Sequence, residues 1–221
     1  APDPGTKVSG KNKNEDRYTS VKFSPDGRFL AYAATNEGQF KVRVRNMTNN
    51  EEREIFKGGL KLIDQEVYTH YPILSWADTT TLGIVYAENG ANVLAVKRLG
   101  EKGEQKLKIP LLGIIQSFDF KDGGRLAVMT GSINDVSNAY VYNLVRGQVR
   151  KISDDRFDER DISFFEGSNQ VVFSSNRSTD SVFVSGPDSL EHVMGNQFNL
   201  YSYDIDYPDS SFKQLTNSLA I

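Results

Sequence analysis

The chain has 221 residues, 38% of them apolar and 25% charged, which is typical of an ordered globular protein and excludes a disordered or fibrous one. The net charge of −3, with lysines and arginines spread along the sequence, excludes the concentrated basic surface of a nucleic-acid-binding protein. The chain has no cysteine and no apolar run near the roughly 20 residues of a membrane-spanning helix, which excludes disulfides, thiol catalysis and a helical membrane span.

Residues 1–15 form a predicted flexible N-terminal segment. Prolines, glycines and lysines alternate there with small polar residues, without the apolar stretch of a signal peptide. We expect any export signal to have been removed already.

After this segment, an aromatic residue, a turn and an apolar strand recur four times. The aromatic anchors Phe23, Trp76, Phe120 and Phe164 are spaced 53, 44 and 44 residues apart. Each copy is predicted to form a β-hairpin. A period of roughly 40 to 45 residues accommodates four strands with their turns, whereas a helical repeat would need apolar residues at every third or fourth position. The sequence therefore predicts four small antiparallel sheets.

The remaining strands can be placed within each period. In the first copy we predict strands at 19–23, 28–35, 40–47 and 53–56. In the later copies, third strands are predicted near 92–99, 139–144 and 198–204, and outer strands near 105–109, 148–152 and 212–215. The second strands are apolar at successive positions, as in Leu30-Ala-Tyr-Ala-Ala34, so we expect them to be buried on both faces between neighbouring sheets. By contrast, Phe40-Lys-Val-Arg-Val-Arg45 alternates, which predicts a strand farther out with its arginines in water.

Three phrases carry a family resemblance: Phe23-Ser-Pro-Asp-Gly-Arg-Phe-Leu-Ala-Tyr32, Asn199-Leu-Tyr-Ser-Tyr-Asp204 and Phe212-Lys-Gln-Leu-Thr216. From about Asp16 onward the chain resembles the TolB-like, WD40-like (PD40) β-propeller repeat proteins of the bacterial envelope. Only the first copy has the full Ser-Pro-Asp-Gly turn, so the family's ligand contacts need not survive in this chain.

The resemblance implies an all-β fold, a β-propeller of four-stranded antiparallel blades. About four blades are expected in this chain, at 16–58, 66–110, 114–153 and 158–217, with 218–221 starting a further blade of a larger ring. The alternatives are a closed ring of four blades and a ring whose missing strands come from another chain. An open arc of blades would leave apolar faces uncovered at its two ends, so we also expect self-association through the open blade edges.

In PD40-type blades the segments that lead into the inner strands lie at one rim of the ring. The residues expected there as partner or ligand contacts are Arg17, Tyr18, His70, Tyr71, Asp158 and Arg160. The alternative is that His70 is only hydrogen-bonded within its loop and that the charges are solvated and paired with each other. The long segment 175–197 is interpreted either as a partner-binding arm carrying Val182, Phe183 and Val184, or as an insertion that packs over the blade edge.

The sequence lacks the motifs of known catalytic and metal-binding sites. It contains no Gly-x-Ser-x-Gly motif, and its two histidines, His70 and His192, fall in different blades, which argues against a Ser-His-Asp triad. The acidic stretch 204–209 lacks the pattern of a calcium-binding loop and is interpreted as a turn. We expect no cofactor and no metal.

The resemblance implies a non-catalytic protein-binding scaffold in the periplasm or cell envelope of a bacterium, with other envelope proteins as partners. The main alternative is the substrate-gating propeller of a prolyl-oligopeptidase-like or tricorn-like serine peptidase whose catalytic domain lies outside this chain. A propeller glycosidase or lyase that uses an axial carboxylate such as Asp158 is a second alternative.

Overall fold

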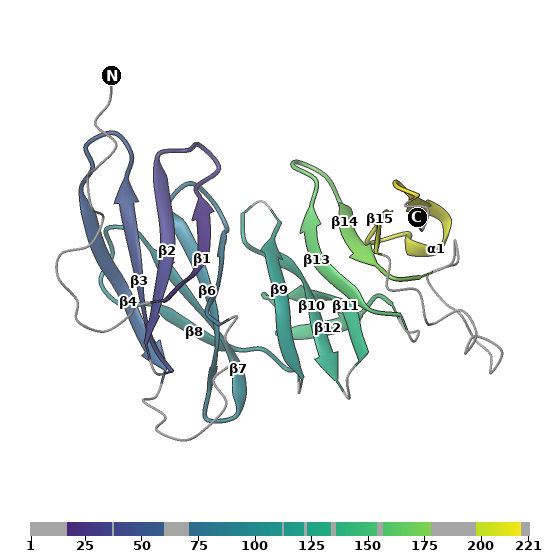
Figure 1. Cartoon of the computed structure of the whole chain (residues 1–221), viewed down its shortest axis with the longest axis horizontal. Coiled ribbons are helices and arrows are strands. Elements are labelled where there is room, and N and C mark those ends of the chain that lie inside the picture. Colours follow the sequence, from purple (N-terminus) through teal and green to yellow (C-terminus); the bar gives the residue numbers. More distant parts are fainter. Residues whose placement is uncertain are drawn as a thin grey trace.

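The structure, a computed structural model, describes residues 17–36, 38–59, 71–111, 113–121, 123–133, 136–153, 157–177 and 198–217. These residues form four antiparallel sheets of four strands each, and one short helix, α1 (Pro208–Ser211). Each sheet consists of four strands that follow one another in sequence and pair in that order (Figure 1).

The strand bounds repeat with the period of the sequence. The first sheet is β1 (Arg17–Phe23), β2 (Phe29–Asn36), β3 (Gln39–Asn46) and β4 (Glu52–Gly59). The second is β5 (Ile73–Trp76), β6 (Thr81–Glu88), β7 (Ala91–Arg98) and β8 (Gln105–Lys108). The third is β9 (Ile114–Phe120), β10 (Leu126–Ile133), β11 (Val136–Asn143) and β12 (Gln148–Lys151). The fourth is β13 (Glu159–Phe164), β14 (Gln170–Ser175), β15 (Asn199–Asp204) and β16 (Lys213–Gln214).

The Ser-Pro-Asp-Gly turn of the first sheet shows why these hairpins close. The Ser24 hydroxyl donates to Asp26 Oδ1 (2.7 Å) and accepts the backbone N–H of Phe29 (3.0 Å). Gly27 has a φ of 70°, a left-handed conformation that costs glycine little. The hydrogen bond from Ser24, supported by Arg28, lowers the pKa of the Asp26 carboxyl to about 2. The turn therefore contains a carboxylate that is ionised across the physiological range.

Neighbouring sheets pack through the aromatic anchors and the second strands. Trp76 lies in one apolar cluster with Ala31 of the sheet before it, and Phe120 lies directly against Gly83. The middle residues of three second strands are buried on successive positions, as the sequence predicts: 31–34 in β2, 82–86 in β6 and 127–131 in β10. In β14 the prediction is wrong, because Val171 and Phe173 are buried but Val172 between them is only half-buried. β3 alternates as expected, with Phe40, Val42 and Val44 buried, but its arginines at 43 and 45 are half-buried and not fully in water.

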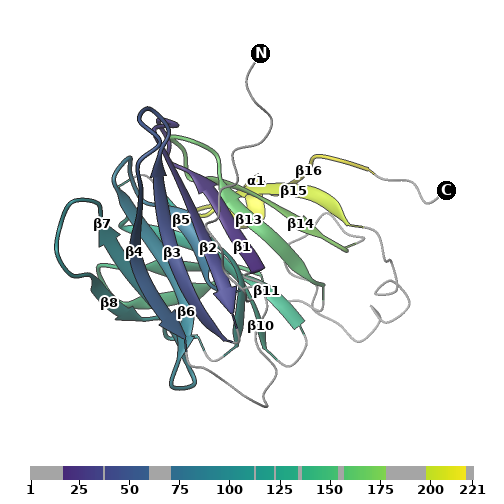
Figure 2. The same ribbon diagram turned by 60° about the vertical axis from the view of Figure 1, so that its left-hand side comes forward.

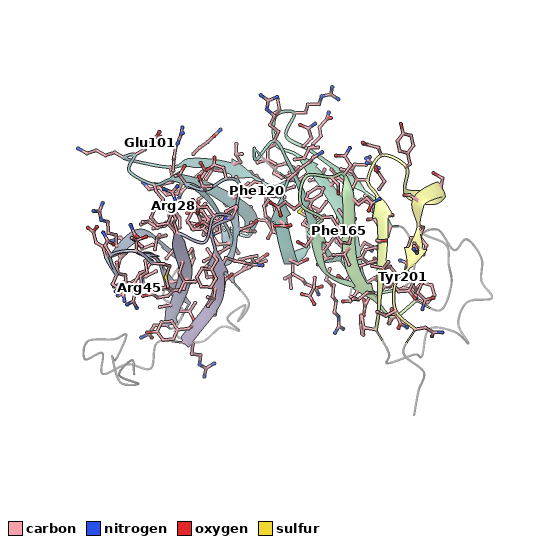
Figure 3. The ribbon with its side chains drawn as sticks, turned by 90° about the horizontal axis from the view of Figure 1, so that it is seen from above. Arg28, Arg45, Glu101, Phe120, Phe165 and Tyr201 are labelled. Atoms are coloured by element: carbon pink, nitrogen blue, oxygen red, sulfur yellow. The ribbon has the colours of Figure 1, made fainter. Side chains whose placement is uncertain are left out.

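The four sheets succeed one another in a curved row, with the first and last at opposite ends (Figure 3). The inner strands lie next to one another along this row: β1 contacts β5, β5 contacts β9, and β9 contacts β13. In a turned view β1 lies on the side of the first sheet that faces the other sheets, and β13 on the corresponding side of the fourth (Figure 2). This radial arrangement confirms the predicted β-propeller of four-stranded antiparallel blades. The stretch 204–209, predicted as a turn, is a turn that continues into the four-residue helix α1.

Candidate functional site

The inner strands are joined by a hydrogen bond that recurs at one position of the repeat. In two sheets, the serine three residues before the aromatic anchor accepts a backbone N–H of the next sheet through its hydroxyl. That N–H belongs to the residue two positions before the anchor of the next sheet. Ser20 Oγ accepts from Leu74 (3.0 Å), and Ser117 Oγ accepts from Ile162 (3.1 Å). A side chain of one blade therefore fixes the backbone of the following blade.

A second recurring bond lies one residue before the anchor. Ser75 Oγ accepts the N–H of Phe120 (3.2 Å), and Asp119 Oδ2 accepts the N–H of Phe164 (3.0 Å). Asp119 also accepts hydrogen bonds from the hydroxyls of Ser75 (3.0 Å) and Ser163 (2.7 Å). One carboxylate thus connects the inner strands of three sheets. Because hydrogen bonds to a charged acceptor are stronger than those to a neutral one, Asp119 holds the inner strands of these three sheets firmly together.

The same bonds place all the inner strands in one direction. From Ser117 to Asp119 the acceptors advance two residues, and so do the donors from Ile162 to Phe164, which makes β9 and β13 parallel. The bonds from Leu74 to Ser20 and from Trp76 to Lys22 give β1 and β5 the same direction. The bonds from Ile115 to Tyr71 and from Phe120 to Ser75 do so for the second and third sheets. The inner strands therefore all begin on the same side of the row of sheets. In each antiparallel sheet the second strand ends and the third strand begins on that side too. We call this side, where Arg17, Ile73, Ile114 and Glu159 begin their strands, the axial rim.

Two of the predicted contact residues lie at the rim on β1. Arg17 and Tyr18 are exposed. The backbone carbonyl of Arg17 accepts a hydrogen bond from Thr35 Oγ1 (3.1 Å), and the Tyr18 ring lies 5.8 Å from the ring of Tyr32. The backbone is held in place while both side chains remain accessible.

The structure brings two further predicted residues together with the end of the long connection in the fourth sheet. Arg160, whose side chain is 53% exposed, places its guanidinium 4.2 Å from the ring centroid of Phe198 and 3.8 Å from Asp158. Asp158 Oδ1 accepts the N–H of Ser137 (3.1 Å), and its own N–H donates to Asn176 (2.8 Å). Asp158 is therefore fixed to the third sheet, and Arg160 is stacked on an aromatic ring with part of its guanidinium facing water.

Tyr71 is buried, so its side chain does not face the axial opening. Its hydroxyl donates to Asn92 Oδ1 (2.8 Å) and accepts the N–H of Ile115 (2.9 Å). It connects the second and third sheets and offers no surface to a partner. His70 and the predicted arm with Val182, Phe183 and Val184 lie outside the described residues.

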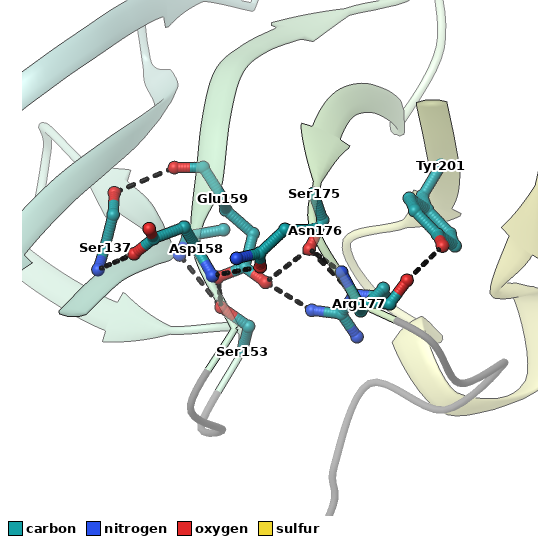
Figure 4. A network of polar contacts seen from close by, with 9 residues as sticks. Ser137, Ser153, Asp158, Glu159, Ser175, Asn176, Arg177 and Tyr201 are labelled. Carbon is teal, nitrogen blue, oxygen red and sulfur yellow. Dashed lines mark hydrogen bonds and ion pairs between the residues drawn. The ribbon is translucent and has the colours of Figure 1, made fainter. Parts of the chain in front are cut away.

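A buried ion pair next to the rim was missed by the sequence reasoning. Glu159 and Arg177 pair with both side chains fully buried (Figure 4). Ser153 donates to Glu159 Oε2 (2.7 Å), and the Ser137 hydroxyl donates to the Glu159 carbonyl oxygen (2.8 Å). In sequence, both charges resemble solvated residues at strand ends. The only signal was their position beside the apolar residues of β13 and β14.

The cation of this pair is enclosed by aromatic rings. The Arg177 guanidinium lies 5.1 to 5.8 Å from the ring centroids of Phe157, Phe173, Tyr201 and Phe212. The Tyr201 hydroxyl donates to the Arg177 carbonyl oxygen (2.8 Å). Burial, together with the nearby Glu159 charge, raises the pKa of Tyr203 well above its usual value. The residue that begins the long connection is therefore tied to the interior of the fourth sheet.

The rim combines a fixed backbone with exposed side chains of both charge signs and with aromatic rings, features suited to recognising another protein surface. Among the described residues, no group of three or more His, Cys, Asp and Glu side chains is placed to hold a metal. The described part of the chain also contains no helix long and apolar enough to cross a membrane.

Comparison of the structure with known proteins identifies the fold. TolB from Acinetobacter baumannii superimposes with a TM-score of 0.65 at 13% sequence identity, over 93% of this chain and 45% of TolB. The fold is that of the TolB-like β-propellers. The resemblance inferred from the sequence is therefore confirmed for the fold, and the chain spans less than half of the TolB chain. The sequence matches no family model and no curated protein.

Propellers of peptidases share the TolB-like fold with this chain. A prolyl endopeptidase superimposes with a TM-score of 0.62 at 9% identity, over 96% of this chain and 30% of the enzyme. A puromycin-hydrolysing peptidase of Mycobacterium tuberculosis gives a TM-score of 0.59 at 16% identity, over 92% of this chain and 29% of the enzyme. At identities this low, the superpositions establish a shared fold only, and the fold by itself does not decide function.

Proposed function

We propose that the chain is a non-catalytic scaffold that binds other proteins through its axial rim. The observation that carries this proposal is that Arg17, Tyr18, Asp158 and Arg160 all lie at the axial rim, where the inner strands of the first and fourth sheets begin. Arg160 is stacked on Phe198, where the connection from Arg177 returns to the sheet. Rigid strands that present charged and aromatic side chains at their ends are the usual arrangement of a binding surface on a scaffold.

The periplasm or envelope of a bacterium is the proposed location, and the proposed partners are envelope proteins. The support is the TolB-like fold. Fractionation of the native cells, with detection of the full-length protein, tests the location. Recovery in the cytosolic fraction would contradict it.

A second candidate function is supported by the peptidase propellers that share the fold. In such enzymes the propeller would gate access to a hydrolase domain encoded outside this chain. A Gly-x-Ser-x-Gly motif on a strand-to-helix turn elsewhere in the full-length protein would favour this function over the scaffold.

Site-specific photocrosslinking tests the rim as the binding surface. A photoreactive residue at Arg160 of the full-length protein in its native cells is expected to capture a defined protein. The same residue at Val145, 76% exposed in a turn outside the rim, is expected to capture none. The captured protein is then purified, and its Kd for the wild-type chain is compared with that for Arg160→Glu and Val145→Glu.

The Kd values of the two variants show whether the rim is the binding surface. A negative charge placed in an interface weakens binding more than a negative charge placed outside it. We expect a Kd at least about tenfold higher for Arg160→Glu, corresponding to roughly 1.4 kcal/mol, and an unchanged Kd for Val145→Glu. Equal effects of the two substitutions would exclude the rim as the binding surface.

A further inference from the structure

A buried charge in the fourth sheet occupies a position that an apolar residue fills in the third. Glu159 and Ile115 each stand five residues before the aromatic anchor of their inner strand, and both side chains are 0% exposed. Ile115 packs in an apolar cluster of the second and third sheets, whereas Glu159 pairs with the buried cation of Arg177. A buried ion pair gains little stability over an apolar pair of similar volume. Stability alone therefore does not account for this pair.

The start of β13 is separated from the rest of the strand by a β-bulge. Arg160 pairs with Ser174 on β14, whereas the register of the later residues, continued without a shift, would pair it with Ser175. Asp161, the next residue, has a φ of 54°, which residues other than glycine adopt at a cost. Two residue pairs hold β13 to β14 on the rim side of this bulge. Backbone pairing therefore fixes the register only weakly in residues 158–160, which we call the rim segment.

The bulge decides which side chain of the rim segment faces the interior. Ser175 is buried, and the residue paired with it shares its face of the sheet. In the observed register this residue is Glu159, while Arg160 faces outwards with its side chain 53% exposed. In the regular register, without the bulge, Arg160 would take the interior place and Glu159 would face outwards, because a slip of one residue turns each side chain to the other face.

The charges decide between the two registers. The regular register would bring the cations of Arg160 and Arg177 together in the interior and move the carboxylate of Glu159 to the surface. The observed register joins opposite charges instead, in a place where an uncompensated charge is costly. This pairing outweighs the strained backbone of Asp161.

We propose that the positive charge of Arg177 selects the bulged register of the rim segment and thereby keeps Arg160 outside. Arg177 is then a positioning residue for the binding surface, an assignment that rests on the proposed function. The contacts of the rim segment depend on the same choice. Arg160 stacks on Phe198 at 4.2 Å, and Asp158 accepts the N–H of Ser137 at 3.1 Å, in the observed register.

Reversing the charge at position 177 tests the proposal. In Arg177→Glu the bulged register would place two carboxylates side by side in the interior, whereas the regular register pairs the new carboxylate with Arg160. We therefore expect this variant to fold with Arg160 inside and Glu159 outside. An Arg177→Glu variant that does not fold would overturn the proposal, because the second register is expected to supply the buried carboxylate with a cation.

The side-chain Nε–H of Arg160 reports on the register without a partner. It is followed by NMR and assigned through its loss in Arg160→Lys. In Arg177→Glu its exchange with solvent is expected to be at least about tenfold slower than in the wild type, because burial protects it. The Nε–H of Arg53, whose side chain is 71% exposed, is the internal control and should keep its rate. Unchanged rapid exchange at Arg160 in folded Arg177→Glu would contradict the proposal.

Arg177→Lys is the conservative control, because it retains the positive charge and changes the shape of the side chain. Arg160 should stay outside in this variant, with the exchange rate of the wild type. Burial of Arg160 in Arg177→Lys as well would show that the sign of the charge does not select the register.

Asp161 gives an independent measure of the bulge. A β-branched residue strongly disfavours a positive φ, so Asp161→Val should lower the urea midpoint of the wild-type chain. In Arg177→Glu the same substitution should leave the midpoint unchanged, since the regular register has no bulge at this position. Equal decreases in the two backgrounds would show that the bulge persists in Arg177→Glu, which would overturn the proposal.

The Kd for the protein captured at the rim connects the register to binding. Arg177→Glu is expected to raise it about tenfold, as Arg160→Glu does, and Arg177→Lys should leave it unchanged. An unchanged Kd in Arg177→Glu with Arg160 buried would support the register change and contradict the proposed binding surface. A raised Kd with Arg160 still exchanging rapidly would contradict the positioning role of Arg177 instead.

Discussion

Glu159 and Arg177 can both be buried because each neutralises the other and because hydroxyl groups satisfy the remaining oxygens of the carboxylate. A buried ion pair gains little over an apolar pair of similar volume, but the loss of one member leaves an uncompensated charge. The aromatic rings around the Arg177 guanidinium add cation–π attraction.

Arg177→Met is expected to lower the free energy of unfolding by about 3–5 kcal/mol, because it leaves the Glu159 carboxylate buried without its cation. Urea denaturation of the purified chain measures the loss. The control is Arg53→Met, which removes the cation of an exposed pair with Glu51 and should cost less than about 1 kcal/mol. Losses of similar size in both variants would show that Glu159 does not depend on Arg177.

The Asp26 carboxyl in the first hairpin turn is expected to titrate near pH 2, and its ordinary pKa is 3.8. Since the folded-state pKa is lowered, the stabilisation is fully present above pH 3.8 and is lost as the pH falls through about 2. A carboxyl-detected NMR titration measures the midpoint. Ser24→Ala should raise it, because the Ser24 hydroxyl bond is the largest cause of the shift. An unchanged midpoint in that variant would assign the shift to Arg28.

At the scale of the elements, the packing of each anchor on the preceding second strand limits the residues that this strand can carry. Gly83 of β6 lies under the Phe120 ring so closely that a Cβ at position 83 would overlap it. Neither residue alone reveals this from the sequence, because glycine in a strand also reads as a bulge or a weak position.

Gly83→Ala is therefore expected to destabilise the junction between the second and third sheets by about 1–3 kcal/mol, as overpacking of a core does. The double variant Gly83→Ala with Phe120→Leu should cost less than the sum of the two single variants, because the smaller side chain gives the new methyl group room. A double-mutant cycle in urea measures this coupling. Additive losses would mean that the ring moves away freely.

For the whole molecule, the row of sheets implies a stability that differs along the chain. The second and third sheets have a neighbour on both sides, whereas the first and fourth have one described neighbour each. In proteins built from repeats that contact only their neighbours, stability is approximately a sum of repeat and interface contributions.

Hydrogen exchange followed by mass spectrometry is expected to show the slowest exchange in β6, β7, β10 and β11, with faster exchange in β1 and β16. Uniform protection of all four sheets would show that the chain opens as a single cooperative unit.

The sequence by itself determined the four sheets, their order and their anchors, because an aromatic residue followed by a turn and an apolar strand leaves few alternatives at a period of about 44 residues. It also placed Arg17, Tyr18, Asp158 and Arg160 near one rim, since all four stand at the start of an inner strand. Only the tertiary structure decided that Tyr71 is buried, that Glu159 meets Arg177 and that Asp119 connects three sheets. These contacts join residues from different strands and sheets, and the fate of a polar side chain depends on which partners the fold brings to it, which local sequence does not encode.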